Sequence, residues 1–190
     1  EIGYQAAKMG FKGMITEGAK HVLGWKSPHY LYNNPLAPNL KLLLRDIALS
    51  DDISLRFNDH SWAGYPLFAD HFIDEIASLP EREEVINIFM ELSALGMAQP
   101  LESNILEFFK ALPDCAAARH ITFATPTELC ENRRPVDHLL VPDSLSWVDE
   151  ERDVSPWLGN PMQQEAFNKL YSVADRARIA NDPRINQDWD

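Results

Sequence analysis

Hydrophobic residues along the chain alternate between short continuous runs and longer stretches with helical spacing. The short runs predict strands at residues 13–16, 40–44, 84–90, 121–123 and 139–141. Helical spacing predicts helices at residues 66–79 and 101–112, and Ser50 is the expected N-cap of a shorter helix that precedes both. Strands that alternate with helices are typical of βα units, so the predicted fold class is α/β with a parallel sheet.

Polar residues and prolines mark the connections between these elements. Residues 33–39 hold three asparagines and two prolines and predict a loop. Thr125, Pro126 and Glu128 predict a capping box at the start of a helix. An acidic run near residue 149 precedes Asn160, which is expected to open another helix. We therefore divide the chain into a β/α region, residues 1–149, and a helical region, residues 150–190.

The predicted strand at residues 13–16 ends at the candidate for a reactive group. Glu17 follows this strand directly, and open α/β folds and barrels place reactive groups at the carboxyl ends of their strands. Trp25 and two tyrosines, Tyr30 and Tyr32, follow closely. Flat aromatic faces around a carboxylate suit a sugar, although its position alone also fits a solvated strand-end charge.

The 17 residues from Thr16 to Tyr32, TEGAKHVLGWKSPHYLY, resemble the segment of family 57 glycoside hydrolases that holds the catalytic nucleophile in the α-amylase-like group. The resemblance implies that Glu17 is this nucleophile. It also implies a fold, an incomplete seven-stranded β/α barrel with attached helices, of which this chain is the later part. The expected partner is then the upstream remainder of the barrel.

The resemblance extends to a second acidic residue. Retaining glycosidases use two carboxyl groups about 5–5.5 Å apart, and the family's acid/base is an Asp in a motif like MDYETFG. Here Met90 is followed by ELSALG, so Glu91 stands where the catalytic Asp would be. Its side chain is one methylene longer, and a displacement near 1 Å can cost about 10²-fold in rate. Glu91 is expected to act weakly, to have lost turnover, or to be a charge with no catalytic role.

Six further residues are candidates for binding the substrate, each with a structural alternative. Arg45 and Asp46 follow the second predicted strand and could bond sugar hydroxyls, steady the nucleophile, or form a surface ion pair. His21 could bond sugar hydroxyls or be an ordinary polar residue whose hydrogen bonds the protein satisfies. Trp25, Trp62 and Trp157 are candidate stacking platforms that packing explains as well. Trp157 lies in WVDEERDVSPWLGNPMQ, which matches the family's last recognisable segment.

Composition narrows the expected partners and location. The 190 residues include 29 acidic and 17 basic side chains, for a net charge of −12, which disfavours nucleic acid and acidic membranes. Apolar runs are shorter than the roughly 20 residues that a membrane span needs. The two cysteines lack metal-ligand spacing and favour a reducing, cytoplasmic location. No histidine pair has the spacing of a metal site, and the expected chemistry needs no cofactor.

The resemblance to family 57 implies an α-amylase-like retaining glycoside hydrolase that acts on α-1,4-glucans. Two alternatives remain. One is a non-catalytic glucan-binding protein that keeps the cleft, and the other is an α/β domain with an unrelated ligand.

Overall fold

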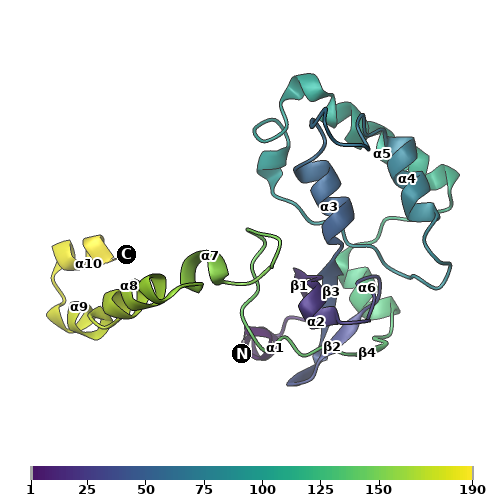
Figure 1. Cartoon of the computed structure of the whole chain (residues 1–190). Helices are drawn as coiled ribbons and strands as arrows, with labels where there is room; N and C mark the ends of the chain where they lie inside the picture. Colours follow the sequence, from purple (N-terminus) through teal and green to yellow (C-terminus); the bar gives the residue numbers. More distant parts are fainter. Residues whose placement is uncertain (1, 190) are drawn as a thin grey trace. The chain divides into compact units, whose positions relative to one another are not determined.

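The computed structural model describes residues 2–189, which form two compact units. The first unit extends to Val141 and the second begins at Pro142 (Figure 1). The first unit holds one four-stranded sheet with helices around it, so the mixed α/β class is confirmed. A seven-stranded barrel stays a prediction, as does the division after residue 149; residues 1 and 190, the outer ends of the two expected regions, lie outside the described residues.

The sheet has the strand order β1-β3-β2-β4. Its strands are β1 (Gly13–Glu17), β2 (Tyr32–Asn34), β3 (Ala37–Arg45) and β4 (Asp137–His138). Strand β1 runs parallel to β3, in a register that sets Glu17 opposite Arg45. Strand β2 is antiparallel to β3 and parallel to β4, so the sheet is mixed and the prediction of a parallel sheet is wrong for the β2–β3 hairpin. The strands predicted at residues 13–16 and 40–44 are therefore confirmed.

Two local predictions are wrong. Residues 33–39 do not form a loop throughout, and Ser50 does not cap the helix that follows β3. Residues 33–39 belong to a hairpin of β2 and β3, whose turn is held by the Leu36 N–H donating to Asn34 Oδ1 over 2.8 Å. The N-cap of helix α3 (Ile47–Ser54) lies four residues before Ser50, the expected N-cap. Its N-cap is Asp46, whose Oδ1 accepts from the Leu49 N–H over 2.9 Å. Ser50 lies inside α3, and its Oγ accepts from the Phe89 N–H instead.

Three of the predicted strands differ in the structure. Residues 84–90 form no regular strand but make one parallel bridge to β3, between Asn87 and Arg45. Alternate side chains of this stretch, Ile86, Ile88 and Met90, pack against a cluster of helices, which explains the strand-like pattern. Residues 121–123 have no regular structure. The last predicted strand is replaced by β4, which ends one residue before it.

Strand β3 is covered on both faces, which accounts for its continuous leucine run. Leu42 and Leu44 share a cluster with Leu23 of helix α2 (Lys20–Leu23), and helix α1 (Ile2–Lys8) also contacts β3. On the side of Leu43, helix α6 (Pro126–Asn132) approaches β1 so closely that a Cβ on Gly13 would lie 2.6 Å from Cys130 Sγ. The expected capping box of α6, between Thr125 and Glu128, is present.

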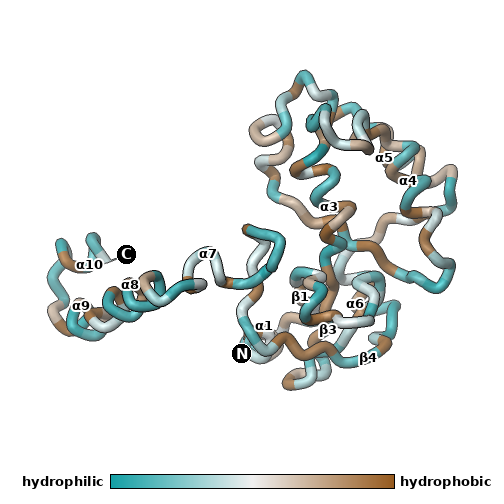
Figure 2. Tube along the Cα trace, in the orientation of Figure 1, coloured by the Kyte–Doolittle hydropathy of each residue, from teal (hydrophilic) through white to brown (hydrophobic). Residues whose placement is uncertain are grey.

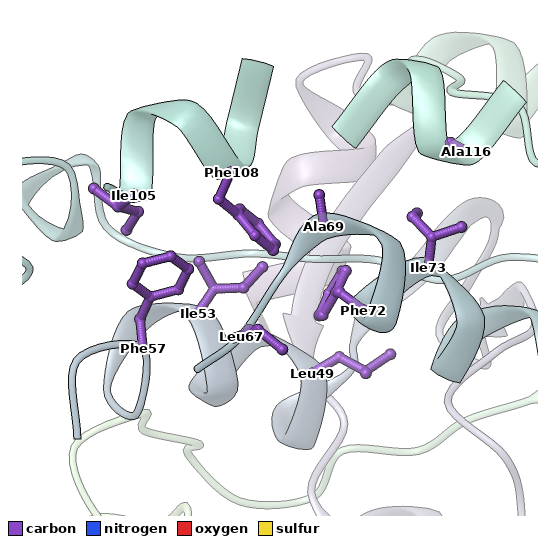
Figure 3. Packing of buried hydrophobic residues seen from close by; sticks show 10 residues of the cluster. All are labelled: Leu49, Ile53, Phe57, Leu67, Ala69, Phe72, Ile73, Ile105, Phe108 and Ala116. Carbon is purple, nitrogen blue, oxygen red and sulfur yellow. The ribbon is translucent and has the colours of Figure 1, made fainter. Parts of the chain in front are cut away.

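A second core lies between three helices that follow β3 in the chain. These are α3, α4 (Ala69–Ala77) and α5 (Ile105–Ala118), and Figure 3 shows their buried side chains meeting. Phe108 is at its centre, with ring centroids 5.3, 5.6 and 5.3 Å from those of Phe57, Phe72 and Phe109. Both α4 and α5 were predicted, but each begins three or four residues later than expected. Two 3₁₀ turns, η1 (Leu92–Ala94) and η2 (Leu101–Ser103), precede α5.

The second unit is helical, with α7 (Ser155–Leu158), α8 (Pro161–Tyr171), α9 (Ala174–Ala180) and α10 (Pro183–Trp189). Asn160 caps α8 as expected, in a capping box with Gln163. The last three helices are mainly hydrophilic with scattered hydrophobic positions (Figure 2), among them Met162 and Ile179, which are 80% and 82% exposed. Across residues 2–189, every helix is too short or too polar to cross a membrane.

Candidate active site

Glu17 and Arg45 meet at the carboxyl edge of the sheet. Because β1 and β3 are parallel and in register, the two residues end neighbouring strands side by side. Glu17 Oε2 lies 3.4 Å from Arg45 Nη1, and the two side chains are only 10% and 7% exposed. Gly18 lets the chain leave β1 against β3, since a Cβ at this position would collide with the Arg45 carbonyl oxygen. Glu17, the predicted reactive residue, is therefore a largely buried carboxylate that is paired with Arg45.

The Arg45 guanidinium also contacts two other segments. Its Nη2 lies 2.6 Å from Asp51 Oδ1 on α3, and its Nε donates to the Phe89 carbonyl over 2.6 Å. The rigid fork of a guanidinium suits three acceptors at fixed angles, which an ammonium group would not satisfy together. Arg45 is therefore a buried tie between β1, α3 and the segment that leads to Glu91, and the surface ion pair considered for it is wrong.

Glu91 follows a segment that ends at the same edge of the sheet. The bridge between Arg45 and Asn87 is parallel, so this segment runs in the direction of β1 and β3. The side chain of Glu91 is exposed, and its Oε2 accepts from the Ser93 hydroxyl over 2.9 Å. Glu17 and Glu91 thus follow parallel segments on either side of β3. Their catalytic roles stay predictions.

A second buried charge network lies beside Arg45. Asp46 Oδ2 is 2.6 Å from His29 Nε2, and Glu83 Oε2 is 3.2 Å from His29 Nδ1. All three side chains are about one-tenth exposed. Burial lowers the pKa of His29, but the hydrogen bonds and negative charges of Asp46 and Glu83 outweigh it and raise this pKa above its ordinary value. Burial acts in the opposite sense on Asp46, whose pKa is nevertheless lowered by the hydrogen bonds from His29 and the Leu49 N–H.

Both carboxylate oxygens of Asp46 are hydrogen-bonded. Its Oδ1 accepts from the Leu49 N–H in the first turn of α3, and its Oδ2 contacts His29 Nε2. This makes it a fixed part of the sheet edge, so the surface ion pair considered for it is wrong. A direct bond to a sugar hydroxyl stays a prediction. Its neighbour on α3, Asp52, accepts from Arg56 Nε over 2.6 Å. Burial raises the pKa of Asp52, with the charges of Asp46 and Asp51 adding to the effect and Arg56 opposing it.

Ser27 and Tyr32 complete the support of the His29 network. The Ser27 hydroxyl donates to Glu83 Oε2 over 2.6 Å, and the Tyr32 hydroxyl donates to the Ser27 carbonyl over 2.6 Å. Burial, together with the nearby charges of Asp137 and Glu83, raises the pKa of Tyr32 to about 12. Tyr32 is therefore a buried donor, and the stacking role expected for it with a sugar does not fit a ring that is 2% exposed.

Sequence reasoning missed four of these residues as members of one site: Ser27, His29, Asp51 and Glu83. The run from Ser27 to His29 lay inside the recognised segment, but single polar residues there carry no sign of their partners. The only available signal was Asp51 near the start of a helix that follows a strand ending in Arg45. Glu83 lies in a polar stretch that resembles any exposed connection.

The remaining predicted binding residues are more accessible or lie elsewhere. His21 is exposed on α2, and Trp25 is 91% exposed on the loop after it. Trp62 is half-buried, with the Arg56 guanidinium 5.7 Å from the centre of its ring. Trp157 is 51% exposed on α7, in the second unit. Each could still meet a ligand, so these assignments stay predictions.

Trp62 also lines a hollow of about 340 Å³ in the first unit. Tyr65 and Phe68 contribute further aromatic walls, and His71 and Glu75 contribute polar ones. Within residues 2–189, no group of three or more His, Cys, Asp or Glu side chains is arranged to hold a metal ion.

Comparison with known proteins identifies the family. The model of glycosyl hydrolase family 57 matches residues 1–142, which is most of the chain. A Methanocaldococcus jannaschii protein named "Putative alpha-amylase" is 42% identical over 171 residues, covering 88% of this chain and 36% of that relative. The chain thus spans about a third of the length of this relative. A search of solved structures gave no match. The resemblance seen in the sequence is confirmed: the chain belongs to glycosyl hydrolase family 57.

Proposed function

We propose that the chain carries the catalytic residues of an α-amylase-like retaining glycoside hydrolase that acts on α-1,4-glucans. Membership of family 57 supports a glycoside hydrolase, and the name of the Methanocaldococcus jannaschii relative supports an amylase-like one. The observation that carries the proposal is the carboxylate of Glu17, buried at the carboxyl edge of parallel strands and 3.4 Å from Arg45 Nη1. A guanidinium at this distance favours the ionised carboxylate that a nucleophile requires.

In the proposed reaction, Glu17 attacks the anomeric carbon of a glucose unit. As the bond from this carbon to the leaving oxygen breaks, Glu91 gives its proton to that oxygen, and a covalent glycosyl ester forms on Glu17. Water then attacks the anomeric carbon of the ester while Glu91 takes back a proton. The sugar leaves with retained configuration and Glu17 returns to its carboxylate form.

Glu91 is the weaker half of this pair. Its carboxyl group is carried on one more methylene than an Asp would have, and it is exposed beside Ser93. A proton donor displaced by about 1 Å can lower the rate about 10²-fold. These features favour slow turnover, and they also favour the second candidate function, a non-catalytic protein that binds α-glucans.

Turnover by the full-length protein separates these functions. We expect new reducing ends from maltooligosaccharides and soluble starch, loss of this activity in Glu17→Gln, and faster turnover in Glu91→Asp. Glu107→Gln is a matched control, because Glu107 is exposed and forms an ion pair with Lys110 on the surface of α5. Glucan binding without turnover, followed by turnover in Glu91→Asp, would favour the non-catalytic function. Full activity in Glu17→Gln would refute the proposed nucleophile.

A further inference from the structure

The imidazole of His29 lies between two carboxylates that belong to different segments. Its Nε2 faces Asp46 at the start of α3, and its Nδ1 faces Glu83 before the segment that leads to Glu91. A neutral imidazole has one ring nitrogen that donates and one that accepts. Since both nitrogens face acceptor oxygens here, the contacts are satisfied together only when both carry a proton. With both ring nitrogens protonated, His29 donates to both carboxylates and holds Glu83 and Asp46 to one point.

Backbone hydrogen bonds extend this attachment along the segment. The N–H groups of Glu84 and Val85 both lie within bonding distance of the His29 carbonyl, at 3.2 and 3.0 Å. Beyond them, Asn87 accepts from the Asp46 N–H over 2.9 Å and donates its side-chain amide to the Leu44 carbonyl over 2.9 Å. The segment is therefore fastened first to the loop between α2 and β2, which carries His29, and then to the end of β3.

This fastened segment ends two residues before the proposed acid/base. Its Phe89 carbonyl accepts from Arg45 Nε, and the same guanidinium contacts Glu17. These contacts attach the segment that precedes Glu91 to the loop between α2 and β2 and to the end of β3. The position of Glu91 relative to Glu17 then depends on the contacts that His29 makes.

We propose that His29 is a positioning residue, which holds the segment before Glu91 against the carboxyl end of β3 and so sets the separation of the Glu17 and Glu91 carboxyl groups. The proposal rests on the proposed function for its catalytic consequence. Its structural part, the hold on residues 83–89, stands apart from any reaction. Replacing His29 should therefore weaken acid catalysis by Glu91 more than nucleophilic attack by Glu17.

Two substrates distinguish positioning from a general effect on folding. A maltooligosaccharide needs Glu91 to protonate its leaving oxygen, whereas α-maltosyl fluoride releases fluoride without that proton. The ratio kcat/KM for the fluoride reports attack by Glu17 alone. In the full-length protein, His29→Gln is expected to lower kcat/KM for maltooligosaccharides about tenfold or more, while the fluoride reaction stays near the wild-type rate. A matched control is His138→Gln, since His138 is exposed on β4.

Hydrogen exchange gives a second measurement that needs no activity. Amide exchange in a peptide covering residues 83–91 is expected to be faster in His29→Gln than in the wild type and in His138→Gln. Unchanged exchange in this peptide would overturn the proposal, and so would equal losses on both substrates. If the wild type acts on neither substrate, the proposed function fails, and the catalytic consequence of His29 fails with it. Faster exchange would then still establish its hold on the segment.

Discussion

Replacing Arg45 by Met is expected to unfold the first unit at a much lower temperature. Met keeps much of the length and apolar stem of Arg but removes the guanidinium that contacts Glu17, Asp51 and the Phe89 carbonyl. All three charged side chains are at most one-tenth exposed, so water screens their charges poorly. Two carboxylates near one another then lose the cation that separates them.

The magnitude follows from the burial of this group. Removing one partner of a buried ion pair costs about 3–5 kcal/mol, because the other charge stays out of water. For a unit of this size, each 1 kcal/mol lowers the melting temperature by about 2–4 °C, so Arg45→Met should lower it by roughly 6–20 °C. Adding Asp51→Asn removes one of the two remaining charges. The double variant should therefore lose less stability than the sum of the two single variants.

Thermal unfolding followed by circular dichroism of the full-length protein checks this prediction. The matched control is Arg119→Met, which removes an ion pair to Asp74 of similar length, 2.6 Å, between side chains that are half exposed. This control should melt near the wild-type temperature. A shift no larger for Arg45→Met than for Arg119→Met would refute the reasoning, as would strict additivity with Asp51→Asn.

Two further predictions concern the His29 network and the helical core. His29 has a raised pKa in the folded protein, so its stabilising contribution is full below pH 6.5 and is lost as the pH rises through the raised value. The difference in melting temperature between wild type and His29→Gln should therefore shrink between pH 6 and pH 9, and a constant or growing difference would contradict this. Phe108→Ala removes a ring that meets three other rings, and should cost about 3–5 kcal/mol in denaturant unfolding. A loss no greater than that of Leu106→Ala, at a 41% exposed position on the same helix, would contradict it.

The elements that could be predicted from sequence are those whose pattern has one physical meaning. The leucines of β3 are buried on both faces of the sheet, and their short continuous apolar run correctly predicted a strand. Residues 84–90 have a similar pattern, but their alternate side chains face the helical core and their backbone makes one bridge. A local pattern records which side chains are buried and does not record what buries them.

The same limit applies to the site. The position of Glu17 at the end of a strand could be predicted from the apolar run before it. His29 and Glu83 lie far apart in the sequence, and neither position alone differs from an ordinary polar residue. Asp46 was considered for its charge, but its use as a helix cap was assigned to Ser50, four residues later, because Ser50 and the acidic residues after it satisfy the same capping pattern.

The central claim is that Glu17 forms the covalent bond to the sugar. Incubating the full-length protein with 5-fluoro-α-glucosyl fluoride should accumulate the glycosyl-enzyme, because the second fluorine slows both steps while the fluoride leaving group favours the first. Proteolysis and mass spectrometry should then place the added sugar on the peptide that contains Glu17, with no such adduct in Glu17→Gln. A sugar ester on Glu91 or on another carboxylate, or turnover of glucans by Glu17→Gln at the wild-type rate, would contradict it.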